Sequence, residues 1–493
     1  MSELNPYEYV TVPDGWECKR LIDCTEDKNI SYGIVQPGQH VDDGIPVIRV
    51  NNVNNGQLQL LDVLKVSPET ESKYKRTRLK GGEVLLTLVG STGQSFVAPK
   101  QLSGWNVPRA IAVIRARDDV GADWINLCLQ SQETKHFLDV RANTTVQKTL
   151  NLKDVRDIPI LIPPHSIKES IENMALSLSN KIELNRQINQ TLEQMAQALF
   201  KSWFVDFDPV KAKISAKDAW INLHGAIPAT DSHVYTDYAQ SLCVAAMSVI
   251  SGKTTAQLEA FATQNPEQYQ SLKATADLFP DAMQDSELGD VPEGWEVGNI
   301  GALIKAKGGY AFKSKDFQKE GFPVIKIKNI NISGVIDTSN CQCVGGELSE
   351  SAKRFRLNNG DILMAMTGAT VGKTGVYVSD GRHGYLNQRV AIFKTLINGV
   401  DCNWYAFNLL TLLPIYEQIV STAQGSAQPN ISSSGIELIK VIIPDSTVIL
   451  KYQSLMTSSY VKWMNNIQEN YDLGELRDTL LPKLLSGELN VSH

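Results

Sequence analysis

The sequence predicts an α+β protein with two tandem domains of mixed α/β structure, separated by two long antiparallel coiled-coil helices. Three observations lead to this fold class. The chain of 493 residues is internally repeated. Each copy is rich in short Val/Ile segments separated by Gly, Asn and Asp, which is typical of strands joined by loops. Each copy then ends in apolar residues spaced alternately by three and four, which is typical of a coiled coil.

The repeat is visible in several short segments. "VPDGWE" at Val12 recurs as "VPEGWE" at Val291, and "GIPVIRVNNV" from Gly44 corresponds to "GFPVIKIKNI" from Gly321. "VPRAIAV" likewise resembles "NQRVAIF", which places Arg109 opposite Arg389. Because counterparts lie 277 to 281 residues apart, the chain consists of two copies of one sequence.

These copies divide the chain into five predicted segments. They are a first globular domain (1–165), a first spacer helix (166–206), a connecting helical and linker segment (207–285), a second globular domain (286–446) and a second spacer helix (447–493). Within the connecting segment we expect helical stretches at Thr236–Ile250 and Thr254–Phe261. We expect His224 and His233 in a surface loop, and no catalytic spacing.

The spacer helices keep a constant relation to each other. From Gln147 to Phe204 the offset to the second copy stays at 281 residues, as expected for an element whose length cannot change. The predicted seam is Ile171, Met174, Leu178, Asn185, Ile188, Leu192, Met195 and Leu199 in copy one, and Tyr452, Leu455, Ser459, Asn466, Leu473, Leu476 and Leu480 in copy two. Asn185 and Asn466 share a seam position, where a polar residue costs stability but can fix register and partner. An ordinary amphipathic helix with a tolerated asparagine is the alternative.

The predicted length of these helices suits a spacer. A straight helix from Ile167 to Phe204 measures about 57 Å at about 1.5 Å per residue. One turn of B-DNA is shorter, roughly 34 Å. We therefore expect an antiparallel helix pair that keeps two similar domains at a fixed distance.

Composition excludes several classes of protein. The net charge of −7 excludes a globally basic nucleic-acid binder, so any DNA contact must come from local patches. No apolar run is long enough to span a membrane, and the first residues lack the layout of a signal peptide. The seven cysteines are scattered without CxxC spacing, which favours a reducing cytoplasm over a disulfide or zinc framework.

One Gly-rich segment, "GATVGKT" from Gly368, tests for a phosphate-binding loop. The pattern G-x-x-x-x-G-K-[ST] needs one more residue between Gly368 and Gly372. The counterpart "GSTGQ" from Gly90 has no lysine, and "SGKTT" at Ser251 lacks the first glycine. The sequence therefore predicts a tight strand-to-strand turn that presents polar side chains.

Positive signs of an enzyme are missing. The chain has no Asn/Asp-Pro-Pro-aromatic tetrapeptide of an adenine methyltransferase, and no G-x-S-x-G, HExxH or paired CxxC. His383 has no histidine counterpart in copy one, so we expect a surface contact there. We predict no catalytic residue, no metal site and no cofactor bound by this chain.

What remains is recognition of DNA. Two basic clusters, "KYKRTRLKGG" from Lys73 and "AKRFRLNNG" from Ala352, occupy equivalent positions and suggest contacts to phosphates. Bases would be read by Arg, Asn, Gln, Ser and Thr side chains. The candidate DNA-binding residues are Lys73, Lys75, Arg76, Arg78, Lys80, Ser91, Thr92, Gln94, Arg109, Gln147, Lys148, Lys326, Lys328, Lys353, Arg354, Arg356, Thr370, Lys373, Arg382, Asn387, Gln388, Arg389 and Gln428.

These residues resemble a known family, the specificity subunit of type I restriction–modification enzymes. The resemblance rests on the "PxGWE" start, the "GATVGK" loop, "NQTLEQMAQALFKSWFVDFDPVKAK" and the closing "LRDTLLPKLLSGEL". It implies two target-recognition domains that each read one half of a bipartite asymmetric DNA site. It also implies long helices that dock two methyltransferase subunits, with a translocase-nuclease subunit joining for cleavage. S-adenosylmethionine, Mg and ATP would belong to those partners.

The region from Asp218 to Thr275 departs from a plain duplication of this family pattern. The helix residues expected to serve as spacer or partner surface are Asn185, Leu192, Met195, Leu199, Phe200, Trp203, Asn466, Leu473, Leu476 and Leu480. For Phe200 and Trp203, with Phe204, a closed core is the alternative to a bound partner. A stand-alone DNA-binding regulator without methyltransferase partners, and an enzyme with an unrecognised active site, are the alternative functions.

Overall fold

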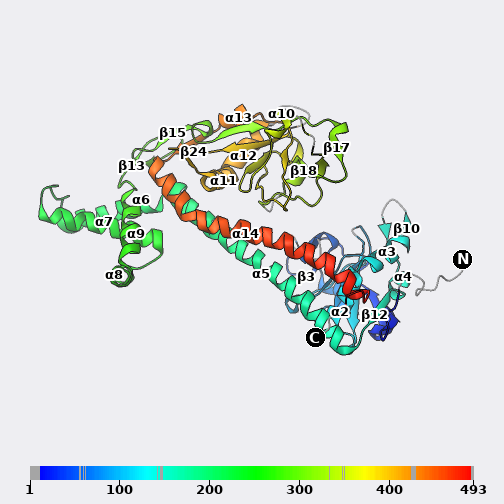
Figure 1. Cartoon of the computed structure of the whole chain (residues 1–493). Helices are drawn as coiled ribbons and strands as arrows, with labels where there is room; N and C mark the ends of the chain where they lie inside the picture. The colour runs from blue at the N-terminus through cyan, green and yellow to red at the C-terminus, as the bar shows by residue number, and fades with distance from the viewer. Residues whose placement is uncertain are drawn as a thin grey trace. The chain divides into compact units, whose positions relative to one another are not determined.

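A computed structural model describes residues 11–489 apart from 55–56, 59, 61–62, 91, 142, 145–147, 332–333, 347, 349 and 424–428. It contains two compact units. The first unit combines Met1–Lys181 with Leu473–His493, and the second comprises Ile182–Asp472. Helices and strands alternate in both units, so the predicted α+β class is confirmed (Figure 1).

The first unit is organised around a four-stranded antiparallel sheet in the order β2-β9-β7-β8. These strands are β2 (Thr25–Tyr32), β7 (Val84–Thr87), β8 (Ser95–Val97) and β9 (Ile111–Ala116). All four side chains of β7 are buried, because the sheet has a core on each face. Val84 and Leu86 pack with Trp124 of α2 (Ala122–Gln130), whereas Leu85 packs with Phe96 in a separate cluster. The alternation of β7 thus serves two cores.

Smaller elements complete this unit. Strand β1 (Glu17–Arg20) pairs with β12 (Pro159–Ile162) just before the first long helix. The other paired strands are β3 (Ile45–Val47) with β6 (Leu64–Val66), β4 (Val53–Asn54) with β5 (Gln57–Leu58), and β10 (Asn143–Thr144) with β11 (Lys148–Thr149). The short helices are α1 (Pro68–Ser72), α3 (Gln132–Arg141), α4 (Leu152–Arg156) and the 3-10 turns η2 (Leu21–Cys24), η3 (Val50–Asn52), η4 (Lys75–Thr77) and η5 (Lys100–Leu102).

The second unit contains the same sheet, in the order β16-β23-β20-β21. Its strands are β16 (Lys305–Gly308), β20 (Ile362–Ala365), β21 (Thr374–Val376) and β23 (Val390–Lys394). As in β7, the side chains of β20 alternate between two cores. Ile362 and Met364 lie in one, and Leu363 and Ala365 in the other. The predicted repeat is therefore a repeat of three-dimensional structure.

The other strands of the second unit are short. A sheet in the order β17-β19-β18-β22 uses β17 (Phe317–Gln318), β18 (Phe322–Ile325), β19 (Gln342–Val344) and β22 (Tyr385–Leu386). Three pairs follow: β13 (Met283–Gln284) with β14 (Val291–Pro292), β15 (Glu296–Asn299) with β26 (Lys440–Ile443), and β24 (Leu396–Ile397) with β25 (Val400–Asp401). The helices are α10 (Glu350–Lys353), α11 (Asn403–Thr411), α12 (Leu413–Ala423), α13 (Ser433–Glu437), η6 (Ile300–Ala302), η7 (Ser314–Asp316), η8 (Ile327–Asn329) and η9 (Gly368–Thr370).

Two helices of 40 residues each follow the last strand of the copies. They are α5 (His165–Phe204) and α14 (Ser446–Leu485), and both ends are related by the 281-residue offset. Within the second unit they lie side by side and antiparallel, because Asn185 contacts Asn470 while the Tyr452 hydroxyl donates to the Ala196 carbonyl (Figure 1). In the first unit Leu481, Leu484 and Leu485 of α14 pack in one cluster with Ile171 and Ala175 of α5.

The predicted seam on α5 is displaced by one residue at Met174, Ile188 and Met195. On α5, Met174 and Met195 are 37% and 63% exposed, whereas their neighbours Ala175 and Ala196 are 1% exposed. Asn189 is likewise buried beside the predicted Ile188. On α14, Leu455 and Leu476 of the predicted seam are exposed, whereas Tyr460 and Trp463, which the predicted seam omits, are buried. The error arises because small and polar residues occupy close helix contacts that hydrophobicity assigns to the larger neighbour.

The aromatic end of α5 is a core of the chain itself. Phe200, Trp203 and Phe204 are buried, and Phe204 packs against Tyr405, Tyr452 and Trp295 with ring centroids 5.1, 5.4 and 6.1 Å away. Their burial contradicts the prediction that these rings face a partner. The closed core is what the structure contains.

The connecting segment is mostly helical. It contains α6 (Asp208–His224), α7 (His233–Ser251), α8 (Thr255–Gln264) and α9 (Pro266–Asp277), so both predicted helical stretches are confirmed. His224 and His233 are helix ends rather than loop residues, and the His224 ring stacks on Trp220 at 4.1 Å. The Lys213 ammonium is buried and donates to the Phe279 carbonyl at 2.5 Å, which attaches α6 to the chain after α9.

Three further observations concern the cysteines, possible metal sites and possible membrane spans. All seven cysteines are free thiols. Over the described residues, His, Cys, Asp and Glu form no group of three that could hold a metal ion. No helix in the same residues is long and apolar enough to cross a membrane.

The corrected seam leads to a stability prediction. We expect Phe200→Ala to lower the free energy of unfolding by about 3–5 kcal/mol, since it removes a buried ring from the core. Met195→Ala, on the exposed side of α5, should change it by less than about 0.5 kcal/mol. Urea unfolding of the full chain measures both. Equal losses in the two variants would contradict the packing described here.

Candidate functional site

The Gly-rich segments are hairpin turns, as predicted. Strand β20 leads through η9 into the antiparallel strand β21, whereas a phosphate-binding loop leads into a helix. Gly368 and Gly372 have φ angles of +76° and +82°. The Gly372 and Lys373 amides donate within the turn, to Ala365 and Thr370 carbonyls at 3.0 Å, and so are not directed at a ligand. In copy one, the Gly93 amide makes the equivalent bond to Thr87.

Several side-chain atoms of these turns that were predicted to read bases are buried. The Thr370 hydroxyl and the Gln94 side-chain oxygen Oε1 are buried without a hydrogen-bond partner in the described residues. Thr92 and Lys373 are half-buried. Ser91, Gln147 and Gln428 lie outside the described residues, and of Lys148 only the backbone, in β11, is described.

The first basic cluster contains two kinds of cation: some form ion pairs within the protein and others, among the described residues, form none. Arg78 donates through Nε to the buried Glu71 at 2.7 Å, and Glu71 also accepts from Asn106 at 3.2 Å. These bonds lower the pKa of Glu71, with Arg78 as the main cause. Lys73 forms an exposed ion pair with Glu69. In the described part of the chain Lys75, Arg76 and Lys80 are exposed and have no ion pair.

The second basic cluster likewise contains cations that contact other side chains and cations that form no ion pair among the described residues. Lys353 pairs with Glu350 at 2.7 Å, and the Lys326 ammonium lies 3.7 Å from the centre of the Phe317 ring. Arg356 contacts the His383 ring at 2.8 Å. Lys328 and Arg354 are exposed, and no ion pair involves them among the residues described.

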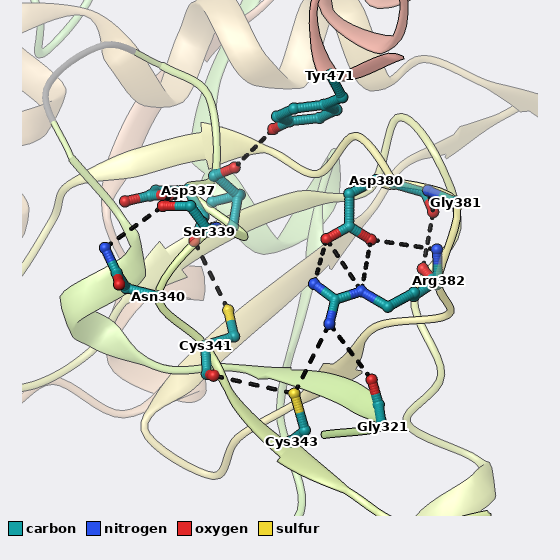
Figure 2. A network of polar contacts seen from close by, with 12 residues as sticks. Gly321, Asp337, Ser339, Asn340, Cys341, Cys343, Asp380, Gly381, Arg382 and Tyr471 are labelled. Carbon is teal, nitrogen blue, oxygen red and sulfur yellow. Dashed lines mark hydrogen bonds and ion pairs between the residues drawn. The ribbon is translucent and has the colours of Figure 1, made fainter. Parts of the chain in front are cut away.

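Arg382 belongs to a polar network that holds two loops together (Figure 2). Its guanidinium pairs with Asp380 at 2.5 Å, and it also reaches the Gly321 carbonyl at 3.5 Å and the Cys343 sulfur at 3.9 Å. Nearby, the Tyr471 hydroxyl of α14 donates to the Ile336 carbonyl at 3.5 Å. These contacts give the Arg382 guanidinium a structural role within the second unit.

Backbone hydrogen bonds correct one part of the sequence alignment. In copy one the Ile34 amide donates to Val107 and the Arg109 amide donates back to Ile34. In copy two Tyr310 makes the same pair of bonds, donating to Leu386 and accepting from Gln388. The structural counterpart of Arg109 is therefore Gln388, and its expected pairing with Arg389 is wrong. The similar letters "RAI" and "RVA" favoured a shift of one residue that the register of β9 and β23 does not allow.

The helix pair contains a buried polar interlock. The Asn185 amide donates to Asn470 at 3.0 Å, and the Asn466 amide donates to Asn189 at 2.8 Å. The 281-residue offset converts Asn185 into Asn466 and Asn189 into Asn470, so the two bonds are images of each other. The seam predicted from the sequence contains the first asparagine of each helix and omits the second, although both recur at the same offset.

Other bonds in the interlock have no image. Trp463 donates through Nε1 to the Glu193 carboxylate at 2.6 Å. The counterparts of Glu193 and Trp463 are Gly474 and Ile182, which cannot form such a bond. Asn185 also donates to Glu469 at 2.8 Å. The pairing of α5 with α14 is therefore reciprocal at the asparagines and asymmetric around them.

Glu193 makes the stability of the helix pair depend on pH. Burial raises its pKa, and the Trp463 bond only partly opposes this. Because the carboxyl is more acidic in the unfolded chain, stability is lost as pH rises from the unfolded pKa of about 4.3 to the raised folded value. Glu193→Gln keeps an acceptor for Trp463 but does not ionise. We expect this variant to gain stability relative to the natural chain as pH rises from about 5 to about 8.

Urea unfolding at several pH values measures this difference. Glu193→Leu serves as the matched control, because it leaves the Trp463 N–H without an acceptor and should cost about 1–3 kcal/mol at every pH. A constant difference between the Gln variant and the natural chain would refute the proposed titration of Glu193.

Comparisons with known proteins assign the family. The chain matches the family described as type I restriction modification DNA specificity domain twice, over residues 13–194 and 292–458. It is 30% identical to the type I restriction enzyme HindI specificity subunit of Haemophilus influenzae, over 83% of this chain and 87% of that protein. It is 21% identical to the MjaIX specificity subunit of Methanocaldococcus jannaschii, over 100% of this chain and 98% of that protein.

A solved structure that the chain also matches is the S subunit of a type I restriction–modification system from M. genitalium. It is 12% identical, with a TM-score of 0.49 and coverage of 97% of this chain and 98% of that chain. The two matched segments cover the two structural copies described above and leave most of the connecting helices outside. The chain belongs to the family of DNA specificity subunits of type I restriction–modification enzymes, and its resemblance to that family is confirmed.

Proposed function

We propose that the chain reads a bipartite, asymmetric DNA site, with one half-site contacted by each copy. The observation that carries this proposal is the structural repeat, in which the same four-stranded sheet is combined with different surface side chains. Two equal backbones provide two equivalent reading positions, and different side chains provide different sequences. Family membership supports DNA recognition and does not favour a stand-alone regulator.

Phosphate contacts would come from the exposed cations without ion pairs. Lys75, Arg76 and Lys80 serve in the first copy, and Lys328 and Arg354 in the second. Because the whole chain is acidic, these local clusters supply the salt-dependent part of the affinity. Arg78 and Arg382 contribute mainly by holding loops in place.

We further propose that α5 and α14 set the gap between the half-sites. The equal length of 40 residues and the buried interlock make the pair a suitable rigid spacer. Removing one heptad from both helices, on the same side of the interlock, should change the gap in the recognised sequence and leave both half-sites unchanged. A methylation motif with the original gap would contradict this role.

The partners proposed for this chain are two methyltransferase subunits and, for cleavage, translocase-nuclease subunits. The side chains that could receive a partner are the exposed apolar ones, rather than the buried Phe200 and Trp203. Leu184 and Met195 are 50% and 63% exposed and lie three turns apart on the same side of α5. S-adenosylmethionine, Mg and ATP would bind the partners, and this chain would act without catalysis or a cofactor.

Methylome sequencing of cells with and without this gene tests the proposed function. We expect N6-methyladenine at one gapped motif to disappear when the gene is removed. Exchanging residues 1–165 for those of a relative should change one half of the motif only. An unchanged methylome in cells that express the partner subunits would refute the proposal.

We expect substitutions of the exposed cations without ion pairs to behave differently from a substitution of Arg78, which pairs with the buried Glu71. Lys75→Ala and Arg76→Ala should each reduce the slope of log affinity against log salt by about 0.9, for every DNA sequence alike. Both should leave unfolding unchanged. Arg78→Ala should instead lower the free energy of unfolding by about 1–3 kcal/mol, because the buried Glu71 loses its main donor. Salt titrations of DNA binding and urea unfolding distinguish these results, and a destabilised Arg76 variant would contradict the assignment.

A further inference from the structure

The turn before β9 in copy one has the same backbone structure as the turn before β23 in copy two. In copy one, Pro108 accepts from the Ile111 amide, and the Arg109 amide donates to Ile34. In copy two, Asn387 accepts from the Val390 amide, and the Gln388 amide donates to Tyr310. Arg109 and Gln388 occupy the same position of the turn, and both are exposed.

This turn lies directly beside the Gly-rich turn in each copy. The Leu88 amide donates to the Ala110 carbonyl at 2.7 Å, and the Met366 amide donates to the Arg389 carbonyl at 3.0 Å. Leu88 and Met366 begin the two Gly-rich connections. The residue next to the exposed Arg109 or Gln388 is therefore fixed to the end of the central strand.

In the first copy the same turn is also fixed to the basic cluster. Asn106 is completely buried, and its amide donates to Glu71 and to the Tyr74 carbonyl, both at 3.2 Å. The Thr77 hydroxyl donates to Asn106 at 2.9 Å. Thr77 follows Arg76, one of the cations assigned to phosphates. The backbone of Arg109 thus belongs to a turn that is attached both to the segment carrying Arg76 and to the start of the Gly-rich connection.

A side chain in this place is suited to reading a base edge. Its backbone is held by at least two hydrogen bonds, so little freedom is lost on binding. Arginine matches the O6 and N7 acceptors of guanine, whereas glutamine matches the N6 donor and N7 acceptor of adenine. Both patterns are presented in the major groove. The two side chains at the one shared position therefore distinguish different base pairs.

We propose that Arg109 and Gln388 are equivalent specificity-determining residues, with Arg109 reading a guanine in the first half-site and Gln388 an adenine in the second. This inference rests on the proposed function and names the bases read at one position of each half-site. It assigns Arg389 and Asn387, the neighbours of Gln388, no equivalent role.

The first test exchanges the two side chains in the full chain, coexpressed with its methyltransferase subunits. In Arg109→Gln, we expect one G·C pair of one half-site to become A·T in the methylated motif, with the other half and the gap unchanged. Gln388→Arg should give the opposite change in the other half. Arg156→Gln is the matched control, since this exposed arginine of α4 has no assigned DNA contact and its loss should leave the motif as it is. An unchanged motif in both exchange variants would overturn the inference.

A DNA-binding measurement tests the same inference in variants whose complexes do not methylate DNA. Duplexes with 7-deazaguanine lack the N7 acceptor, and each guanine of the motif is replaced in turn. We expect one replacement to weaken binding by the purified natural complex about tenfold to a hundredfold. Arg109→Ala should bind more weakly and lose its sensitivity to that one replacement. If the variant keeps the sensitivity of the natural complex at every guanine, Arg109 does not read one.

The two proposals fail in different ways. If the natural complex methylates no gapped motif, the proposed function itself is wrong. If it does so and Arg109→Gln methylates the same motif, only the assignment of the reading residues is wrong. Comparison of the unfolding of Arg109→Gln with that of the natural chain excludes a folding defect, which an exposed side chain without a described partner should not cause.

Discussion

The antiparallel pairing of α5 and α14 is the constraint on which the rest of the molecule depends. Each helix begins three residues after the last strand of its copy, β12 or β26, and each of these strands is paired with an early strand of the same copy, β1 or β15. The start of each helix is thereby fixed to its own domain. The register of the helix pair is consequently the feature on which the proposed spacer role rests.

The buried asparagines of the interlock lower the stability of the helix pair but fix its register. Asn185 and Asn466 are completely buried, and one oxygen of each has no hydrogen-bond partner in the described residues. Leucine at these positions would avoid that cost, but it would tolerate a shifted partner more readily. Glu193 and Trp463 add a bond that only the pairing of α5 with α14 can form, because neither helix carries both groups at the required places. The polar layer therefore specifies both the register and the identity of the paired helix.

Much of the architecture could be predicted from the sequence, since repetition and fixed offsets are properties of the letters themselves. The structural repeat, the hairpin nature of the Gly-rich segments and the 281-residue relation of the helices all follow from such patterns. Side-chain placement could not be predicted in the same way. Ala175 and Ala196 are buried because another helix approaches them closely, whereas Met195 is left exposed although it is more hydrophobic.

The candidate site shows the same limit more clearly. Charge alone could not separate Arg78, which neutralises a buried carboxylate, from Arg76, which does not. The role of Arg78 depends on its bond to the buried Glu71 carboxylate, which is also bonded by Asn106, 35 residues further along the chain. The equivalence of Arg109 and Gln388 was hidden for another reason. Letter similarity favoured Arg389, and only the backbone bonds to Ile34 and Tyr310 fix the register.

This equivalence supports the proposal that a duplicated frame recognises an asymmetric site. The bonds that hold each reading turn are made by the backbone, so they do not depend on which side chain the exposed residue carries. A substitution at position 109 or 388 can then change the preferred base while the sheet, the Gly-rich turn and the helix interlock stay the same. Buried residues such as Asn106 hold the turn in place and Asn185 fixes the helix register, whereas the proposed specificity lies in exposed residues of the turns. Under the proposed function, such a chain changes what it recognises one half at a time, without a new fold.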